Sequence, residues 1–205
     1  MRFLGWQDAC AGTGHCTVQL EADRTVVARY AQRGSAWLRA WNFHTSCRPV
    51  KTTIPQILGA EVGPMGGASE SGGRFQPHLR GEPEQHLLNP PCFIGSTPTF
   101  VELDDVQIVT TEGKQLDADD TATVIDPNRP GIASPYLKRI HVEIDGTWFM
   151  AGVAPALLPP PPARIDLQGF VFWDTGHVGA AWHSYSGWEL HPVAGWTATL
   201  PTELR

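Results

Sequence analysis

Residues 93–205 combine short runs of β-branched and aromatic residues with closely spaced turn signals, and this pattern limits the fold more than any other feature. Each run has the length of a β-strand, and Asp-Gly, Pro-Asn and Thr-Gly pairs stand between the runs. We therefore expect one all-β domain, built as a compact β-barrel (OB-like) or as a β-sandwich. The predicted strands are residues 99–109, 121–125, 137–144, 147–151, 164–173 and 188–196.

The clearest turn signal in this domain is the pair Asp145-Gly146. It stands between two of the predicted strands, residues 137–144 and 147–151. Asp-Gly is typical of the type I′ turn, which joins two antiparallel strands through a two-residue loop. The sequence therefore predicts a β-hairpin at this point.

The preceding segment, residues 32–92, is rich in residues that interrupt regular structure. Seven Gly and seven Pro fall between residues 43 and 92. Such a composition cannot sustain a long helix or a central strand. We expect an irregular linker with little regular structure between residues 1–31 and the all-β domain.

Four cysteines are present, at positions 10, 16, 47 and 92. Their spacing does not match the close pairs of a structural zinc site. Cys10 and Cys16 flank a short glycine-containing segment, which favours a disulfide between them; the alternative is two buried thiols of a cytosolic protein. Cys47 and Cys92 flank most of the linker, and they either pair with each other or pair with cysteines outside this sequence. Disulfides imply an oxidising compartment.

Charge is distributed unevenly along the chain. The net charge of −6 is the sum of about +2 for residues 1–92 and −8 for residues 93–205. An acidic domain repels phosphate backbones, so a protein or glycan ligand is favoured over nucleic acid. No apolar run approaches the roughly 20 residues of a membrane-spanning helix, so we expect no membrane span.

Two mirrored triplets are the strongest candidate for a metal site. His141 and Glu143 are two residues apart on one predicted strand, and Glu189 and His191 are two residues apart on another. Residues i and i+2 of a strand share a face, so paired strands would bring the four side chains together. Zn²⁺ or another divalent metal suits such ligands, to which His177 and His183 could add. In the alternative, these polar residues face solvent or bond each other across strands, without a metal.

Aromatic residues gather in the same C-terminal region. With adjacent polar groups they could form a surface that stacks against a ligand such as a glycan. In the alternative, the tryptophans belong to the core of a small domain. The candidate ligand-surface residues are Trp173, Trp182, His183, Tyr185 and Trp188.

Motifs of common enzymes are missing from the sequence. It contains neither the G-x-S-x-G of serine hydrolases nor the H-E-x-x-H of zinc proteases. Asp117-x-Asp119-Asp120 matches only the first positions of a calcium-binding loop, and a solvated turn is favoured there. The residues therefore favour a non-catalytic module without a cofactor, and zinc is the alternative.

Residues 1–31 contain three linked motifs, which are Phe3-Leu4-Gly5-Trp6, Ala9-Cys10-x-Gly12-Thr13-Gly14-x-Cys16-Thr17-Val18 and Ala22-Asp23-x-Thr25-Val26-x-Ala28-x-Tyr30. In these motifs the segment resembles the C-terminal half of a divergent InlB B-repeat-like bacterial surface domain. The resemblance implies a truncated small β-repeat module that begins inside a domain, without catalytic residues. It also implies a bacterial, extracytoplasmic protein, secreted or on the cell surface, with a signal peptide upstream of this fragment.

The stretch from Ser186 to Pro192 is similar to uncharacterised bacterial OB-like β domains, which assigns no function. We therefore expect a non-catalytic module of a bacterial exported or cell-surface protein, used for adhesion, spacing or ligand binding. One alternative is a metal-binding or metal-dependent hydrolytic domain that uses the His/Glu cluster. A second alternative is an OB-like oligonucleotide-binding domain.

Overall fold

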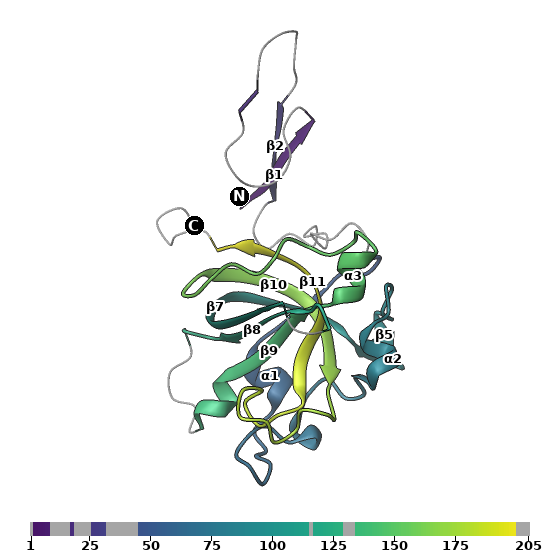
Figure 1. Ribbon diagram of the computed structural model, residues 1–205, viewed down its shortest axis with the longest axis vertical. Coiled ribbons are helices and arrows are strands. Elements are labelled where there is room, and N and C mark those ends of the chain that lie inside the picture. Colours follow the sequence, from purple (N-terminus) through teal and green to yellow (C-terminus); the bar gives the residue numbers. More distant parts are fainter. Residues whose placement is uncertain are drawn as a thin grey trace.

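A computed structural model describes residues 2–8, 17–18, 26–31, 45–114, 117–128 and 134–199. Its centre is a closed barrel of five strands (Figure 1). The strands are β7 (Phe100–Lys114), β8 (Asp120–Ile125), β9 (Arg139–Ile144), β10 (Arg164–Trp173) and β11 (Trp188–Ala198). The order is β7-β8-β9-β11-β10, and β10 pairs with β7 to close the ring. This confirms the all-β prediction and the barrel alternative rather than the sandwich.

One strand pairing of the barrel is parallel, and it positions the candidate site. β9 and β11 run in the same direction, with Glu189 opposite His141 and Leu190 opposite Val142. The other four pairings of the ring are antiparallel. The two mirrored triplets of the sequence therefore lie on neighbouring strands.

The described part of the segment expected to be a linker, residues 45–92, packs on the barrel, so the prediction of little regular structure is wrong for these residues. Residues 45–92 form β3 (Val50–Thr52), α1 (Ile54–Leu58), the 3₁₀ turn η1 (Glu70–Gly72), β4 (Leu79–Arg80) and α2 (Glu82–Gln85). β3 pairs with β7 and β4 pairs with β10, both in parallel. A small β5–β6 hairpin (Phe93–Ile94 and Thr97–Pro98) follows.

Scattered apolar side chains attach this segment to the core. Ile54, Ile57 and Phe75 are buried in the main apolar cluster together with residues of the barrel strands. Its glycines allow close packing: a side chain at Gly73 would collide with the ring of Trp188. Gly and Pro therefore shape a folded covering layer here instead of a mobile connection, and the domain boundary does not fall at residue 92.

The disulfide between Cys47 and Cys92 is present, as the sequence allowed. The two Cα atoms are 5.9 Å apart, and the residues are separated by 45 positions in the sequence. Cys47 packs against a second apolar cluster that includes Phe100 and Phe170. The bridge therefore joins both ends of the covering segment beside the barrel. Cys10 and Cys16 lie outside the described residues.

The Asp145-Gly146 pair does not form the predicted hairpin. Asp145 caps the short helix α3 (Gly146–Met150), and its Oδ1 accepts a hydrogen bond of 3.1 Å from the Trp148 backbone N–H. Aspartate is a preferred N-cap residue because it satisfies a free N–H of the first helical turn. The predicted strand at residues 147–151 is thus a helix, and the next barrel strand begins only at Arg164.

The first two strands lie outside the barrel. β1 (Arg2–Asp8) and β2 (Val26–Ala31) form a separate antiparallel pair, drawn above the barrel in Figure 1. Within the part of the chain that the structure describes, no helix has both the length and the apolar character needed to cross a membrane.

Candidate metal centre

The parallel β9–β11 pair has one apolar face and one polar face. Val142 and Leu190 belong to the main apolar core. Because side chains alternate along a strand, their neighbours point to the other face. These neighbours are the four predicted ligands His141, Glu143, Glu189 and His191, and each is at most 8% exposed. The structure brings the four residues together, and none of them faces solvent because this face is covered as well. His191 pairs with Glu143 across the two strands, as the alternative also allowed.

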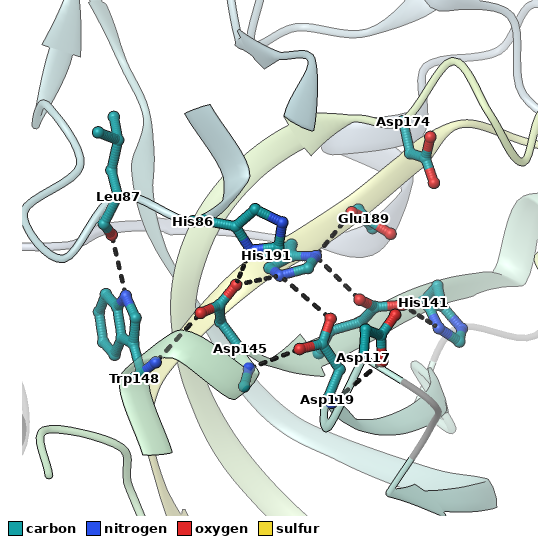
Figure 2. A network of polar contacts seen from close by, with 12 residues as sticks. His86, Leu87, Asp117, Asp119, His141, Asp145, Trp148, Asp174, Glu189 and His191 are labelled. Carbon is teal, nitrogen blue, oxygen red and sulfur yellow. Dashed lines mark hydrogen bonds and ion pairs between the residues drawn. The ribbon is translucent and has the colours of Figure 1, made fainter. Parts of the chain in front are cut away.

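His191 lies at the centre of the polar face, and its two ring nitrogens meet four carboxylates (Figure 2). Nδ1 lies 2.9 Å from Glu143 Oε2 and 3.2 Å from Glu189 Oε1. Nε2 lies 3.2 Å from Asp145 Oδ2 and 3.7 Å from Asp119 Oδ2. We call these five residues the His191 cluster.

Two members of the His191 cluster, Asp119 and Asp145, were not among the metal ligands predicted from the sequence. Asp119 immediately precedes β8, and its Oδ1 accepts a hydrogen bond of 2.5 Å from the Gly146 N–H. Asp145 immediately follows β9 and also contacts His86 Nδ1 at 2.7 Å. The sequence presented Asp119 as part of a solvated turn and Asp145 as part of a hairpin, so nothing local indicated that both point inward.

The calcium-loop interpretation of residues 117–120 does not fit the structure. Asp117 accepts a hydrogen bond from the Asp119 backbone N–H at 3.2 Å. Asp120 instead accepts one from the Leu158 N–H at 2.8 Å. The three carboxylates therefore turn to different partners instead of converging on one point.

Two more histidines flank the His191 cluster. His183 Nε2 lies 2.8 Å from Glu189 Oε2, and His183 Nδ1 contacts the Ser186 carbonyl oxygen. His141 Nε2 lies 2.9 Å from Glu143 Oε1. Among the described residues, the buried Nδ1 of His141 has no hydrogen-bond partner.

Burial and pairing oppose each other in setting the protonation of the cluster. Burial by itself lowers the pKa of His191, but its contacts with Asp145, Glu143 and Glu189 outweigh this and raise the pKa well above its usual value. Burial raises the pKa of Asp119 to about 7, against the opposing charge of His191. Burial would also raise the pKa of Glu143, but hydrogen bonds from His141 and His191 hold it well below its usual value.

Three side chains of the cluster are arranged so that they could hold a metal ion. One ligand atom each from Asp119, Glu143 and His191 lies within 4.8 Å of the others, and all three residues are buried. Among the described residues, none forms a hydrogen bond with the buried Oδ2 of Asp119. Carboxylate oxygens and imidazole nitrogens are ligands for Zn²⁺ and other divalent first-row metals.

The predicted aromatic ligand surface is divided between core and surface. Trp173 and Trp188 are buried, with ring centroids 5.3 Å apart, so they belong to the core as the alternative proposed. The Tyr185 ring packs edge-on against the Tyr136 ring, with the ring centroids 4.7 Å apart. Trp182 is 44% exposed and lies beside the buried His183. Of the three predicted tryptophans, Trp182 alone is exposed to solvent.

No protein-family model, curated protein or solved structure matches this chain. The resemblance of residues 1–31 to InlB B-repeat-like domains therefore stays a prediction. The fold and the cluster define a closed five-stranded barrel protein with a buried carboxylate–imidazole centre.

Proposed function

We propose that the chain is a non-catalytic binding module of a bacterial exported or cell-surface protein, and that its barrel domain binds a divalent transition-metal ion. The ligands are Asp119, Glu143 and His191. The observation that carries this proposal is the buried convergence of their ligand atoms, together with an Asp119 Oδ2 oxygen that accepts no hydrogen bond from any described residue.

The charge of the cluster supports a cation. Four carboxylates surround a single imidazole, and the negative charge of Glu143 is held by its contacts with His141 and His191. An ion at Asp119, Glu143 and His191 would take the place of the His191 proton and neutralise more negative charge than that proton does. Metal ligands in proteins are oriented by further hydrogen bonds. Here His141 contacts Glu143, and the Gly146 N–H donates to Asp119.

Burial favours a binding role over a hydrolytic one. The three proposed ligands are all covered by protein. Structural metal sites are closed, whereas catalytic zinc sites keep one position open to water and substrate. The acidic charge of residues 93–205 argues against the oligonucleotide-binding alternative.

The extracytoplasmic part of the proposal has separate support. The Cys47–Cys92 disulfide is of the kind that persists in oxidising compartments. The resemblance of residues 1–31 to bacterial surface modules is consistent with the same location. Together they favour a domain that meets its metal outside the cytoplasm.

Metal analysis of protein made without an affinity tag tests the proposal. After exposure to Zn²⁺ and removal of excess, we expect near-stoichiometric zinc that is tightly retained by the wild type. Asp119→Asn should weaken zinc binding at least tenfold. The matched control is Asp120→Asn, because Asp120 is also buried but turns to Leu158, and it should retain the zinc. The proposal fails if the wild type retains no zinc, or if both variants bind zinc equally.

A further inference from the structure

We infer that the connection between β10 and β11 carries a second cation site, open to solvent, formed by Asp174, His177 and His183. One ligand atom of each residue lies within 4.8 Å of the others. None of the three belongs to the site at Asp119, Glu143 and His191, so the inference goes beyond the proposed function. Two imidazoles and one carboxylate are a ligand set that suits divalent first-row metals such as Zn²⁺ and Co²⁺.

Backbone hydrogen bonds hold the connection in a defined shape. The Asp174 N–H donates a hydrogen bond of 2.8 Å to the Gly187 carbonyl oxygen, and this bond joins the two ends of the connection. The Tyr185 N–H donates to the Ala180 carbonyl at 2.9 Å. Ser184 and Tyr185 both have φ of 58°, which is a costly conformation for residues with a side chain. A side chain at Gly67 would collide with the backbone of these two residues, so the neighbouring loop packs closely against the turn.

The three ligands differ in their exposure, and this difference leaves one side of the site open. The His183 side chain is fully buried, whereas the His177 side chain is 48% exposed. Asp174 contacts His177 Nδ1, and the exposed ring of Trp182 lies 4.6 Å from the His177 ring. An ion held here would have protein ligands on one side and water on the other, which is the arrangement of exchangeable metal sites.

Glu189 connects the second site with the first. Its Oε2 lies 2.8 Å from His183 Nε2, and its Oε1 lies 3.2 Å from His191 Nδ1. One carboxylate thus contacts a proposed ligand of each ion, as carboxylates behind metal-bound histidines do. His183 has partners at both ring nitrogens, so binding must exchange one of these contacts for the ion. We therefore expect the second ion to bind more weakly than the first.

The number of ions bound at saturation tests this inference. Calorimetric titration with Zn²⁺ should give two equivalents for the wild type, and the Co²⁺ form should show two successive changes in its visible spectrum. His177→Ala should remove the weaker equivalent and keep the tighter one, whereas Asp119→Asn should do the reverse. Asp174→Asn should act in the same way as His177→Ala. Its matched control is Asp126→Asn, because the Asp126 and Asp174 carboxylates each accept a hydrogen bond from the backbone N–H of the residue two positions later.

Each outcome separates the two proposals. Two equivalents that persist in His177→Ala overturn the second site. A single equivalent lost in Asp119→Asn and kept in His177→Ala overturns the second site and leaves the proposed function intact. A single equivalent lost only in His177→Ala overturns the proposed function and supports the surface site. Asp126→Asn losing an ion in the same way as His177→Ala also counts against the second site.

Discussion

The two faces of the β9–β11 pair are equally buried but chemically opposite. Ile140 and Val142 face the main apolar core, whereas His141 and Glu143, their alternating neighbours, face the polar side. Burial of the apolar face is favourable by itself. Burial of the polar face removes charges from water and is offset only by pairing. The extent of burial therefore does not distinguish the residues that form the barrel core from those proposed to bind metal.

The stability of the fold does not require charged residues on the polar face. Replacing buried ion pairs with well-packed apolar residues is often neutral or stabilising. The four carboxylates around His191 are thus not explained by the fold, which the apolar face already specifies. A binding role for the cluster accounts for them, and four predictions examine this contrast.

The largest effect is expected on the apolar face. Leu190→Ala removes a fully buried side chain between Glu189 and His191, and it should lower the free energy of unfolding by about 3–5 kcal/mol. Urea denaturation with and without Zn²⁺ measures this loss, which should be the same in both conditions. A loss well below about 1 kcal/mol would show that burial of the apolar face does not stabilise the barrel as described.

A slightly smaller effect is expected when the centre of the polar face is removed. His191→Leu leaves four carboxylates without their shared imidazole, and it should cost about 3 kcal/mol in metal-free protein at pH 7. Because protonation of the carboxylates relieves their repulsion, the loss should shrink as the pH is lowered. Denaturation of the variant across pH tests this, and a loss independent of pH would mean that packing dominates instead.

A third test concerns His78, a buried histidine of the covering segment that lies outside the His191 cluster. His78 packs against Trp188, and burial, followed by the charge of Arg80, lowers its pKa to about 4. The unfolded chain, with an ordinary His pKa of about 6.5, therefore binds more protons between pH 6.5 and 4. The contribution of His78 to stability should therefore fall by about 2–3 kcal/mol as the pH drops through this window. His78→Leu should flatten the dependence, and an unchanged profile would assign it to other groups.

The smallest effect on stability is expected at the surface. Trp182 is substantially exposed, so Trp182→Ala should change the free energy of unfolding by less than about 0.5 kcal/mol. Buried Trp188→Ala is the matched comparison and should destabilise strongly. A large loss in Trp182→Ala would mean that this ring belongs to the fold rather than to a binding surface.

Much of the barrel could be predicted because its strands carry local signals. The expected strand at residues 164–173 matches β10, and residues 121–125 fall within β8. The covering segment could not be predicted, because isolated residues such as Ile54 and Phe75 have no periodicity that marks them as core. α3 was missed because Asp145 and Gly146 suit a helix N-terminus as well as a turn.

Three of the five residues of the His191 cluster were predicted from their spacing, and the other two could be placed only with the fold. The i, i+2 rule joined His141 to Glu143 and Glu189 to His191, and the strand register then united the two pairs. Asp119 and Asp145 sit at strand ends, where side-chain direction depends on how the chain turns. His86 could not be predicted as a neighbour of the site, because it belongs to the segment expected to be a linker.

The position of β11 also sets the order in which the site can assemble. β11 inserts between β9 and β10, and His191 meets Asp145 across 46 positions of sequence. Such a long-range contact requires a large loop to close, and the entropy of that closure must be paid before the contact stabilises the chain. A folding intermediate without this insertion would hold three of the carboxylates but not the imidazole that joins them. Metal affinity would then appear only with the docking of the final strand, and bound metal would report that the barrel has closed.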